Sequence, residues 1–233
     1  MKFEELGFHN LGAFEKILGL GDDGLVRVPE AVRNQLNERA RFVGMDSVGI
    51  EIRFVTDAPN IDVCISTKKP EFAEKGMMRV YKGNFLYQSL ELNPGAVNTF
   101  RLNSPATFPG ANDKLLKSGG YSPDVWRLVF DRGTAVLHGI HTHGHAVRPP
   151  LREELPALNW LAYGSSITNS SLDGYPHVAV ARLKVQVQNM GFSGACQIEK
   201  ALVDEMLDRR SFDFITCELG VNMRGAFSPE AFE

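Results

Sequence analysis

The sequence has few cysteines, no cluster of basic residues and no long apolar run, and each shortage argues against a class of protein. Its 233 residues include three cysteines without metal-ligand spacing, so we expect reduced thiols rather than a disulfide framework. With a net charge of −3 and no run of Lys and Arg, the chain lacks the basic surface that binds nucleic acid. No stretch approaches the ~20 apolar residues of a membrane span, and the N-terminus lacks the apolar core of a signal peptide. These features predict a cytoplasmic protein that binds neither nucleic acid nor membrane.

The chain begins with weak signals and then one helical pattern. Residues 1–24 are rich in glycine and only weakly amphipathic, which indicates a partly ordered lead-in. Pro29 suits a helix start, and Val32, Leu36 and Ala40 follow at helical spacing. The pattern predicts one helix of about three turns.

Short strands follow between residues 48 and 144. The segment from Ile50 to Phe54 alternates apolar and charged residues, and Lys82-Gly83-Asn84 is typical of a hairpin turn. Several such runs at short intervals predict an antiparallel β-sandwich of jelly-roll type. Residues 104–124 are rich in proline and glycine and predict a long surface loop.

Three prolines in nine residues, from Arg148 to Pro156, end the strand pattern and predict a stiff connection. We place this connection at 148–157, after an N-terminal β-sandwich domain with a leading helix (1–147) and before an α/β domain (158–233). In the last part the predicted elements are strands at 160–163, 185–189 and 212–217 and helices from Pro176 and Ala195. This alternation predicts a parallel sheet with right-handed crossovers.

A short polar segment follows each of the three predicted parallel strands. The segments are Gly164-Ser165-Ser166-Ile167-Thr168, Gly191-Phe192-Ser193-Gly194 and Glu218-Leu219-Gly220-Val221-Asn222. Because the carboxyl ends of parallel strands share one edge, a serine, a glycine-rich turn and an asparagine converge there. Acyl transfer needs a nucleophile, for which we name Ser166, beside donors for the developing oxyanion. The Gly194 N–H and the Asn222 amide are such donors, each typically worth ~3 kcal/mol of the barrier.

Together the three segments resemble the motifs of the GDSL-like, or SGNH, hydrolase family of esterases and lipases. The resemblance covers about residues 158–225 and implies a flavodoxin-like three-layer α/β/α domain that uses no cofactor. It implies Ser166 as nucleophile and oxyanion N–H donor, Gly194 as second N–H donor and Asn222 as amide donor. It also implies a carboxylic ester hydrolase acting on short acyl esters, such as acetylated carbohydrates. The preceding strands resemble the sandwich of some bacterial two-domain members.

The sequence departs from the family pattern in three places. Ser165 stands where the motif usually has Asp, and Met223 replaces the Asp that follows Asn222. The family's catalytic Asp-x-x-His is absent from the sequence, although a serine hydroxyl needs a base to take its proton. We therefore expect the catalytic domain to be incomplete at its C-terminus, with the base His and Asp beyond Glu233.

Other functions stay open at this point. The chain is alternatively a non-catalytic carbohydrate- or protein-binding module with a relic serine site. In the cluster from His138 to His145, the residues His141, His143 and His145 share one face if they lie on a strand, which makes a metal site a weaker alternative. His177 is a candidate base, although a surface role is the default for it. Self-association is also left open, because a three-stranded sheet has an unpaired edge.

The helix expected from Ala195 carries Ile198, Leu202 and Met206 on one face, which is typical of a core helix. If the helix begins beside Gly194, its dipole adds to the oxyanion site. Cys196 falls in its first turn and Cys217 in a buried strand, and we expect both thiols to be inert.

Overall fold

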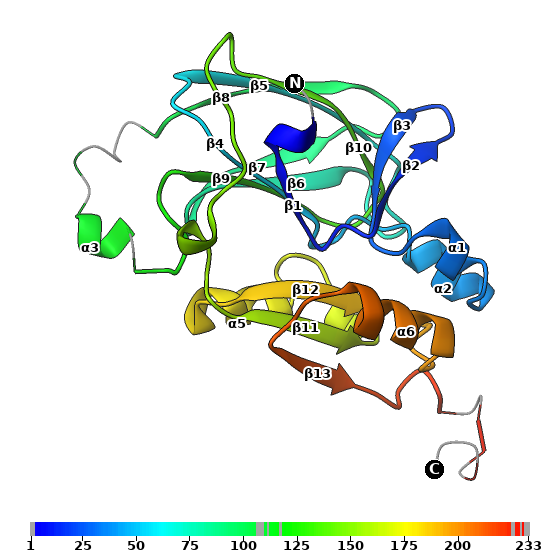
Figure 1. Cartoon of the computed structure of the whole chain (residues 1–233). Helices are drawn as coiled ribbons and strands as arrows, with labels where there is room; N and C mark the ends of the chain where they lie inside the picture. The colour runs from blue at the N-terminus through cyan, green and yellow to red at the C-terminus, as the bar shows by residue number, and fades with distance from the viewer. Residues whose placement is uncertain are drawn as a thin grey trace.

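The computed structural model describes residues 3–105, 110, 112–116, 118–224, 227, 228 and 230, and it arranges two antiparallel sheets above a third, parallel sheet (Figure 1). The first antiparallel sheet has the order β1-β4-β9-β6-β7 and the second β2-β3-β10-β5-β8. The strands of the first sheet are β1 (Gly7–His9), β4 (Glu51–Val55), β9 (Val125–Phe130), β6 (Gly76–Lys82) and β7 (Phe85–Leu92). Those of the second are β2 (Ala13–Ile17), β3 (Gly21–Val26), β10 (Ala135–His141), β5 (Asn60–Thr67) and β8 (Asn98–Asn103). One buried apolar cluster joins the two sheets, with Phe54 and Trp126 from the first and Val63 and Leu137 from the second.

Alternation in the sequence predicted β4, where Ile52 and Phe54 enter the shared core, although Glu51 and Arg53 are buried there as well. In β6, Met78 and Val80 are fully buried while their neighbours are half-buried. The hairpin expected at 82–84 is confirmed, since Lys82 pairs with Phe85 across the turn. Hydrophobic periodicity was therefore a reliable guide in this part of the chain.

Two irregular predictions for this part were wrong. Residues 1–24 were expected to be a loose lead-in, but the 3-10 turn η1 (Phe3–Glu5) is followed there by β1, β2 and β3, and Leu25 is fully buried. The predicted loop at 104–124 lies partly outside the described residues. Within it, α3 (Asp113–Leu116) is helical, and Tyr121 is buried and accepts a hydrogen bond from Arg53 at 3.0 Å.

The single helix expected from Pro29 is two helices, α1 (Glu30–Arg33) and α2 (Glu38–Val43). Asn37 separates them because its side chain caps α2, accepting the Ala40 N–H at 2.9 Å. The Asn37 backbone N–H donates to the Glu199 carboxylate at 2.6 Å. Residue 37 is thus held in extended geometry, and the helix restarts after it.

The last part forms the predicted parallel sheet, in the order β12-β11-β13. Its elements are β11 (Asn159–Gly164), α4 (Ser166–Asn169), α5 (Tyr175–Leu183), β12 (Gln186–Gly191), α6 (Lys200–Arg209) and β13 (Phe214–Glu218), preceded by the 3-10 turn η3 (Arg152–Glu154). Gly164 is paired with Gly191 on one side and with Glu218 on the other. The carboxyl ends of all three strands therefore lie level at one edge.

The helices α1 and α2 belong to the core of this parallel sheet, although they precede most of the antiparallel strands in the sequence. Val28, Leu36 and Val43 are buried in one cluster with Tyr163 and Phe192. Figure 1 accordingly places α1 and α2 beside α6, next to the parallel sheet. No helix in the described part of the chain is long and apolar enough to cross a bilayer.

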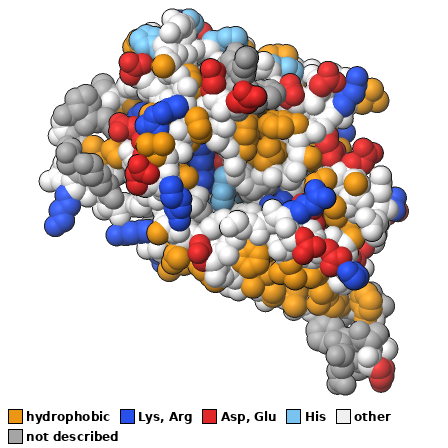
Figure 2. Space-filling view, in the orientation of Figure 1, with side chains coloured by type: hydrophobic (Ala, Val, Ile, Leu, Met, Phe, Trp, Pro, Cys, Tyr) orange, Lys and Arg blue, Asp and Glu red, His pale blue; other side chains and the backbone are white. Residues whose placement is uncertain are grey.

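The strand β13 leaves an apolar surface uncovered. Phe214, Ile215, Leu219 and Val221 are each more than one third exposed, and hydrophobic side chains gather along the lower edge of the molecule, where the parallel sheet lies (Figure 2). Cys217 was expected to be buried in this strand but is exposed, because the outer face of β13 has no layer packed on it among the described residues.

Candidate active site

Ser166 is the first residue of α4, directly after β11. The chain can turn there because position 164 is glycine: a Cβ on Gly164 would stand 2.2 Å from Thr168 Oγ1. Ser165 caps the helix by accepting the Ile167 N–H at 3.3 Å. The Ser166 side chain is exposed, and its N–H, at the first helical position, has no acceptor within the helix.

The carboxylate of Glu218, at the end of β13, holds the residue that precedes Ser166. Glu218 Oε2 accepts the Ser165 N–H at 2.8 Å and the Ser165 hydroxyl at 2.5 Å. Sequence reasoning did not single out Glu218, and its place at the carboxyl end of the third strand was the available signal. The contact ties β13 to the segment that presents Ser166.

The turn after β12 packs directly against α4. Asn189 accepts the Gly191 N–H at 2.9 Å and donates to the Thr168 carbonyl at 2.9 Å. A Cβ on Gly191 would lie 2.0 Å from the Asn169 backbone nitrogen, so only glycine allows this approach. The segments that carry Ser166 and Gly194 are therefore in backbone contact.

Gly194 is the third residue of a tight turn that the Ala195 N–H closes by donating to the Phe192 carbonyl at 3.1 Å. Its φ of +72° lies in the left-handed region that glycine adopts without strain. Gly194 is exposed, and its N–H has no acceptor among the described residues. It is available as a donor to a bound group.

Asn222, in the loop after β13, is oriented by the segment that follows Gly194. Its Oδ1 accepts the Cys196 N–H at 3.1 Å, which leaves the Nδ2 group to donate elsewhere. The segments that carry Ser166, Gly194 and Asn222 thus meet at one edge of the parallel sheet, where each follows the carboxyl end of its strand. Their roles as nucleophile and oxyanion donors stay predictions.

The helix expected from Ala195 begins five residues later, at Lys200, so its dipole is not at Gly194. Residues 196–199 form neither helix nor strand, and Ile198 has a φ of +55°, which is incompatible with a right-handed helix. Cys196 is therefore not in a helical turn. It is buried, as expected, and burial raises the pKa of its thiol to about 11, so the thiol is protonated at neutral pH.

Two arginines from the segment between β3 and β4 reach this site, and sequence reasoning missed both. Arg27, just after β3, is fully buried and donates to the carbonyls of Asn189 at 3.1 Å and Gly191 at 2.9 Å. Burial lowers the pKa of Arg27 to about 10, so it remains charged at neutral pH. Arg39 of α2 donates to the Ser193 carbonyl at 3.0 Å. Their partners are about 155 to 165 positions away, and no local pattern signals such contacts.

A cavity of about 280 Å³ lies between the antiparallel sheets and the loop after α4. Phe72, Arg79 and Arg132 line it on one side and Ser171 on the other. The Arg132 guanidinium lies 5.7 Å from the centre of the Phe72 ring, and this ring is largely exposed. The lining of the cavity therefore combines an exposed apolar ring with cationic and carboxylate side chains.

None of the chain's six histidines, all of which the structure describes, has Ser166 as a hydrogen-bond partner. His177, the internal candidate base, accepts from the Asn189 side chain at 3.3 Å and lies against Gly49. Burial lowers the pKa of His177 to about 4, which suits a neutral structural ring. The structure therefore does not bring His177 and Ser166 together.

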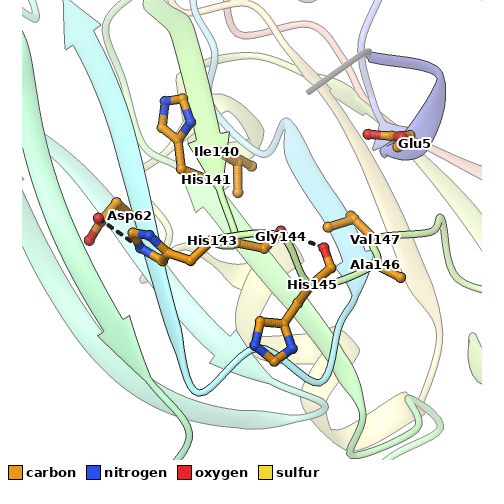
Figure 3. Close-up of a pocket in the computed structure, with 10 residues that line it drawn as sticks. Glu5, Asp62, Ile140, His141, His143, Gly144, His145, Ala146 and Val147 are labelled. Atoms are coloured by element: carbon orange, nitrogen blue, oxygen red, sulfur yellow. Dashed lines mark hydrogen bonds and ion pairs between the residues drawn. The ribbon is translucent and has the colours of Figure 1, made fainter.

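The histidines near the end of β10 do not converge either. The strand ends at His141, and His143 has a φ of +56°, so the alternation needed for a common face is broken. His143 pairs with Asp62 and His145 with Asp57, each at 3.0 Å. Figure 3 shows the three rings of His141, His143 and His145 pointing in different directions. Within the described ranges, no three His, Cys, Asp or Glu side chains form a group that would hold a metal ion.

No family model matches this sequence, and no curated protein matches it. Solved structures do share its fold. The salicylyl-acyltransferase SsfX3 from a tetracycline biosynthetic pathway superposes with a TM-score of 0.71 at 14% identity, over 94% of this chain and 60% of that one. A GDSL-like lipase from Bacteroides ovatus gives a TM-score of 0.55 at 16% identity, over 91% of this chain and 62% of that one.

An acetyl xylan esterase from the rumen bacterium Butyrivibrio proteoclasticus gives a TM-score of 0.51 at 10% identity, over all of this chain and 68% of that one. The chain spans about 60% of the length of the first two structures. At these identities the likeness concerns the fold, which is that of GDSL/SGNH-type esterases and acyltransferases.

Proposed function

We propose that this chain carries the nucleophile and the oxyanion donors of a serine esterase of the GDSL/SGNH type. The observation that supports the proposal is the meeting of three polar segments at the carboxyl edge of one parallel sheet. Ser166 is exposed there, the Gly194 N–H lacks an acceptor among the described residues, and Asn222 is held by its carbonyl oxygen so that its amide nitrogen can donate.

In this reaction Ser166 Oγ attacks the carbonyl carbon of an ester while a base takes the hydroxyl proton, which it later gives to the departing alcohol. The carbonyl oxygen becomes an oxyanion that accepts hydrogen bonds from the N–H groups of Ser166 and Gly194 and from Asn222 Nδ2. The tetrahedral intermediate expels the alcohol, which takes up a proton, and leaves an acyl-enzyme that water hydrolyses. Each donor contributes ~3 kcal/mol to lowering the barrier.

We propose small esters, including acetylated carbohydrates, as substrates. The acetyl xylan esterase is among the proteins that share the fold, and the cavity beside Phe72 has room for a sugar-sized group. Because another of these proteins is an acyltransferase, an alcohol acceptor in place of water is the alternative for the second half of the reaction.

The test is covalent labelling of Ser166 by a fluorophosphonate, with Ser166→Ala as the blank. Because no histidine lies beside Ser166, we expect slow reaction in plain buffer and faster reaction when imidazole is added as an external base. Peptide mapping should locate the phosphonyl group on Ser166. Absence of labelling with and without imidazole would contradict the esterase proposal. Retained binding of a sugar in that case would favour a carbohydrate-binding module.

We also propose that the two antiparallel sheets form a jelly-roll-like sandwich, divided from the α/β part at the proline-rich segment 148–157. The shared core cluster of the two sheets supports this arrangement. The packing of α1 and α2 into the core of the parallel sheet means that the two parts are expected to unfold together.

A further inference from the structure

Arg39 contacts the same peptide group that carries the proposed oxyanion donor. Its Nε donates to the Ser193 carbonyl oxygen at 3.0 Å. That carbonyl and the Gly194 N–H belong to one peptide unit, and in a planar trans peptide they point in opposite directions. Where the Ser193 oxygen is held therefore decides where the Gly194 N–H points.

The Ser193–Gly194 peptide group is the part of the turn whose orientation differs between turn types. In the turn from Phe192 to Ala195, Gly194 has a φ of +72°, while Ser193 is not among the residues of positive φ. This combination is the type II geometry. In a type I turn the central peptide, here Ser193–Gly194, is rotated by about half a turn, and glycine adopts both forms readily.

The bond that closes the turn does not select between the two forms. The Ala195 N–H donates to the Phe192 carbonyl, and this first-to-fourth residue bond is present in both type I and type II turns. The Ser193 side chain accepts from Asn169 at 3.1 Å, which fixes the hydroxyl but not the carbonyl. Among the described contacts, the Arg39 bond is the one that favours the type II orientation.

Arg39 is itself held in place by Glu71, which lies in the loop between β5 and β6 of the antiparallel sheets. Its two terminal nitrogens donate to the two Glu71 oxygens at 2.6 and 2.7 Å, a bidentate geometry that fixes the plane of the guanidinium. Its stem lies against the open side of Gly194, where a Cβ would be 3.6 Å from Nε. A charged donor on the carbonyl also polarises the peptide and strengthens the N–H on its other side.

We propose that Arg39 is a positioning residue of the oxyanion site: it locks the Ser193–Gly194 peptide in the orientation that presents the Gly194 N–H, and Glu71 holds Arg39 for that task. Its catalytic consequence rests on the proposed esterase function, whereas the orientation of the peptide can be measured without any reaction. Loss of Arg39 lets the peptide rotate, which would turn a carbonyl oxygen toward the developing oxyanion.

The sequence offers a selective probe of this peptide. It contains two Ser-Gly pairs, Ser118–Gly119 and Ser193–Gly194. A full-length chain labelled with ¹³C-carbonyl serine and ¹⁵N-glycine therefore gives two correlated signals, one from the turn and one from a distant control site. The nuclear Overhauser effect between Ser193 Hα and the Gly194 N–H is strong in a type II turn and weak in a type I turn, because rotation of the peptide changes that distance.

We expect Arg39→Met to shift or split the Ser193–Gly194 signal and weaken the Overhauser effect, while the Ser118–Gly119 signal stays in place. Arg39→Lys should fall between, because an ammonium reaches one acceptor but cannot span the carboxylate. The matched control is Arg41→Met, which removes an exposed arginine of the same helix that bonds to Leu36 and Asn34. It should leave both signals unchanged.

The second measurement is the rate of Ser166 phosphonylation in imidazole buffer. The rate should fall roughly 10- to 100-fold in Arg39→Met. This loss does not exceed the roughly 10²- to 10³-fold loss of rate that removal of a whole oxyanion donor causes. The rate should stay unchanged in Arg41→Met. Unchanged spectra in Arg39→Met would overturn the inference. So would a changed signal with an unchanged rate. A wild-type chain that never reacts would contradict the esterase proposal, and the spectra would then decide by themselves whether Arg39 sets the peptide.

Discussion

Ser165 and Glu218 share a short contact between two neighbouring parallel strands: the Ser165 hydroxyl donates to Glu218 Oε2 at 2.5 Å, and the Ser165 N–H donates to the same oxygen at 2.8 Å. In the family that the motifs resemble, an aspartate usually stands at the position of Ser165. Here a carboxylate contacts position 165 from the end of the adjacent strand β13.

We predict that Ser165→Asp destabilises the protein and that Glu218→Gln restores it. The single change sets two carboxylates against each other in a buried site, which should cost about 3 kcal/mol of the free energy of unfolding. In the double variant the introduced aspartate caps α4 as well as serine does and accepts from the new amide. Urea unfolding of the four proteins of this cycle measures the coupling, expected to exceed about 1 kcal/mol. Additive effects would show that the two residues do not interact.

Arg27 should be the most costly arginine to remove. It is fully buried, and its bonds go to the oxygens of Asn189, Gly191, Val43 and Asp46 and to the Asn169 side chain. Arg27→Met removes all five of these bonds from a buried site, so we expect a loss of about 4 kcal/mol. The melting temperature should then fall by roughly 8–16 °C.

The control is Arg101→Met, which removes an exposed partner of Asp62 and should leave the melting temperature nearly unchanged. Similar melting temperatures for the Arg27 and Arg101 variants would contradict a central role for Arg27. Because Arg27 binds both the Gly191 turn and Asn169 of α4, its loss should also slow the labelling of Ser166.

The parts of this molecule that the sequence predicted are those specified by neighbours along the chain. Alternation predicted β4, and a turn motif predicted the hairpin of β6 and β7. The motifs after β11, β12 and β13 placed Ser166, Gly194 and Asn222 at one edge, because these parallel strands end level with one another. The expected fold class is confirmed in part. The structure is a mixed α/β fold with two antiparallel sheets, and it resembles solved structures of the SGNH type. The residue roles and the cytoplasmic location stay predictions.

What the sequence did not predict depends on partners far away in the chain. The helix from Pro29 was predicted as one piece because the spacing of apolar residues carries no information about the distant Glu199 carboxylate, which accepts the Asn37 N–H. The helix from Ala195 was predicted too early because Ile198 adopts a positive φ that no composition rule anticipates for a β-branched residue. Glu218, Arg27 and Arg39 were missed for the same reason, since each acts on a residue more than 50 positions away.

Acid should weaken the protein through two histidines at the junction of the antiparallel and parallel sheets. Burial lowers the pKa of His9 to about 3 and that of His177 to about 4. His9 donates to the Val187 carbonyl at 2.9 Å, and His177 accepts from Asn189. Both rings are neutral when folded but take up protons near pH 6.5 when unfolded, so stability is complete above that pH and is lost as the pH falls toward 4.

Between pH 7 and pH 5 the two histidines together should reduce the free energy of unfolding by about 4 kcal/mol, which urea titrations at the two pH values would measure. Glu51 does not share this range, because Arg127 and Arg53 outweigh its burial and hold its pKa well below the usual value. His177→Asn should remove about half of the pH dependence, and the variant His141→Asn, at an exposed position, is the matched control. A pH-independent midpoint between pH 7 and pH 5 would contradict the prediction.

Gly191→Ala tests the backbone contact between the end of β12 and α4. A methyl group there would meet the Asn169 nitrogen at 2.0 Å and the Asn169 Cα at 2.3 Å, and both atoms belong to the backbone of α4, which cannot rotate away. Either β12 or α4 must move, so we expect a loss of about 3 kcal/mol and slower labelling of Ser166. Gly110→Ala is the control, because a Cβ there meets no atom of the described residues within 4 Å. If the Gly191→Ala protein melts and reacts like the wild type, the two segments tolerate separation. Gly194 would then not need a fixed position relative to Ser166.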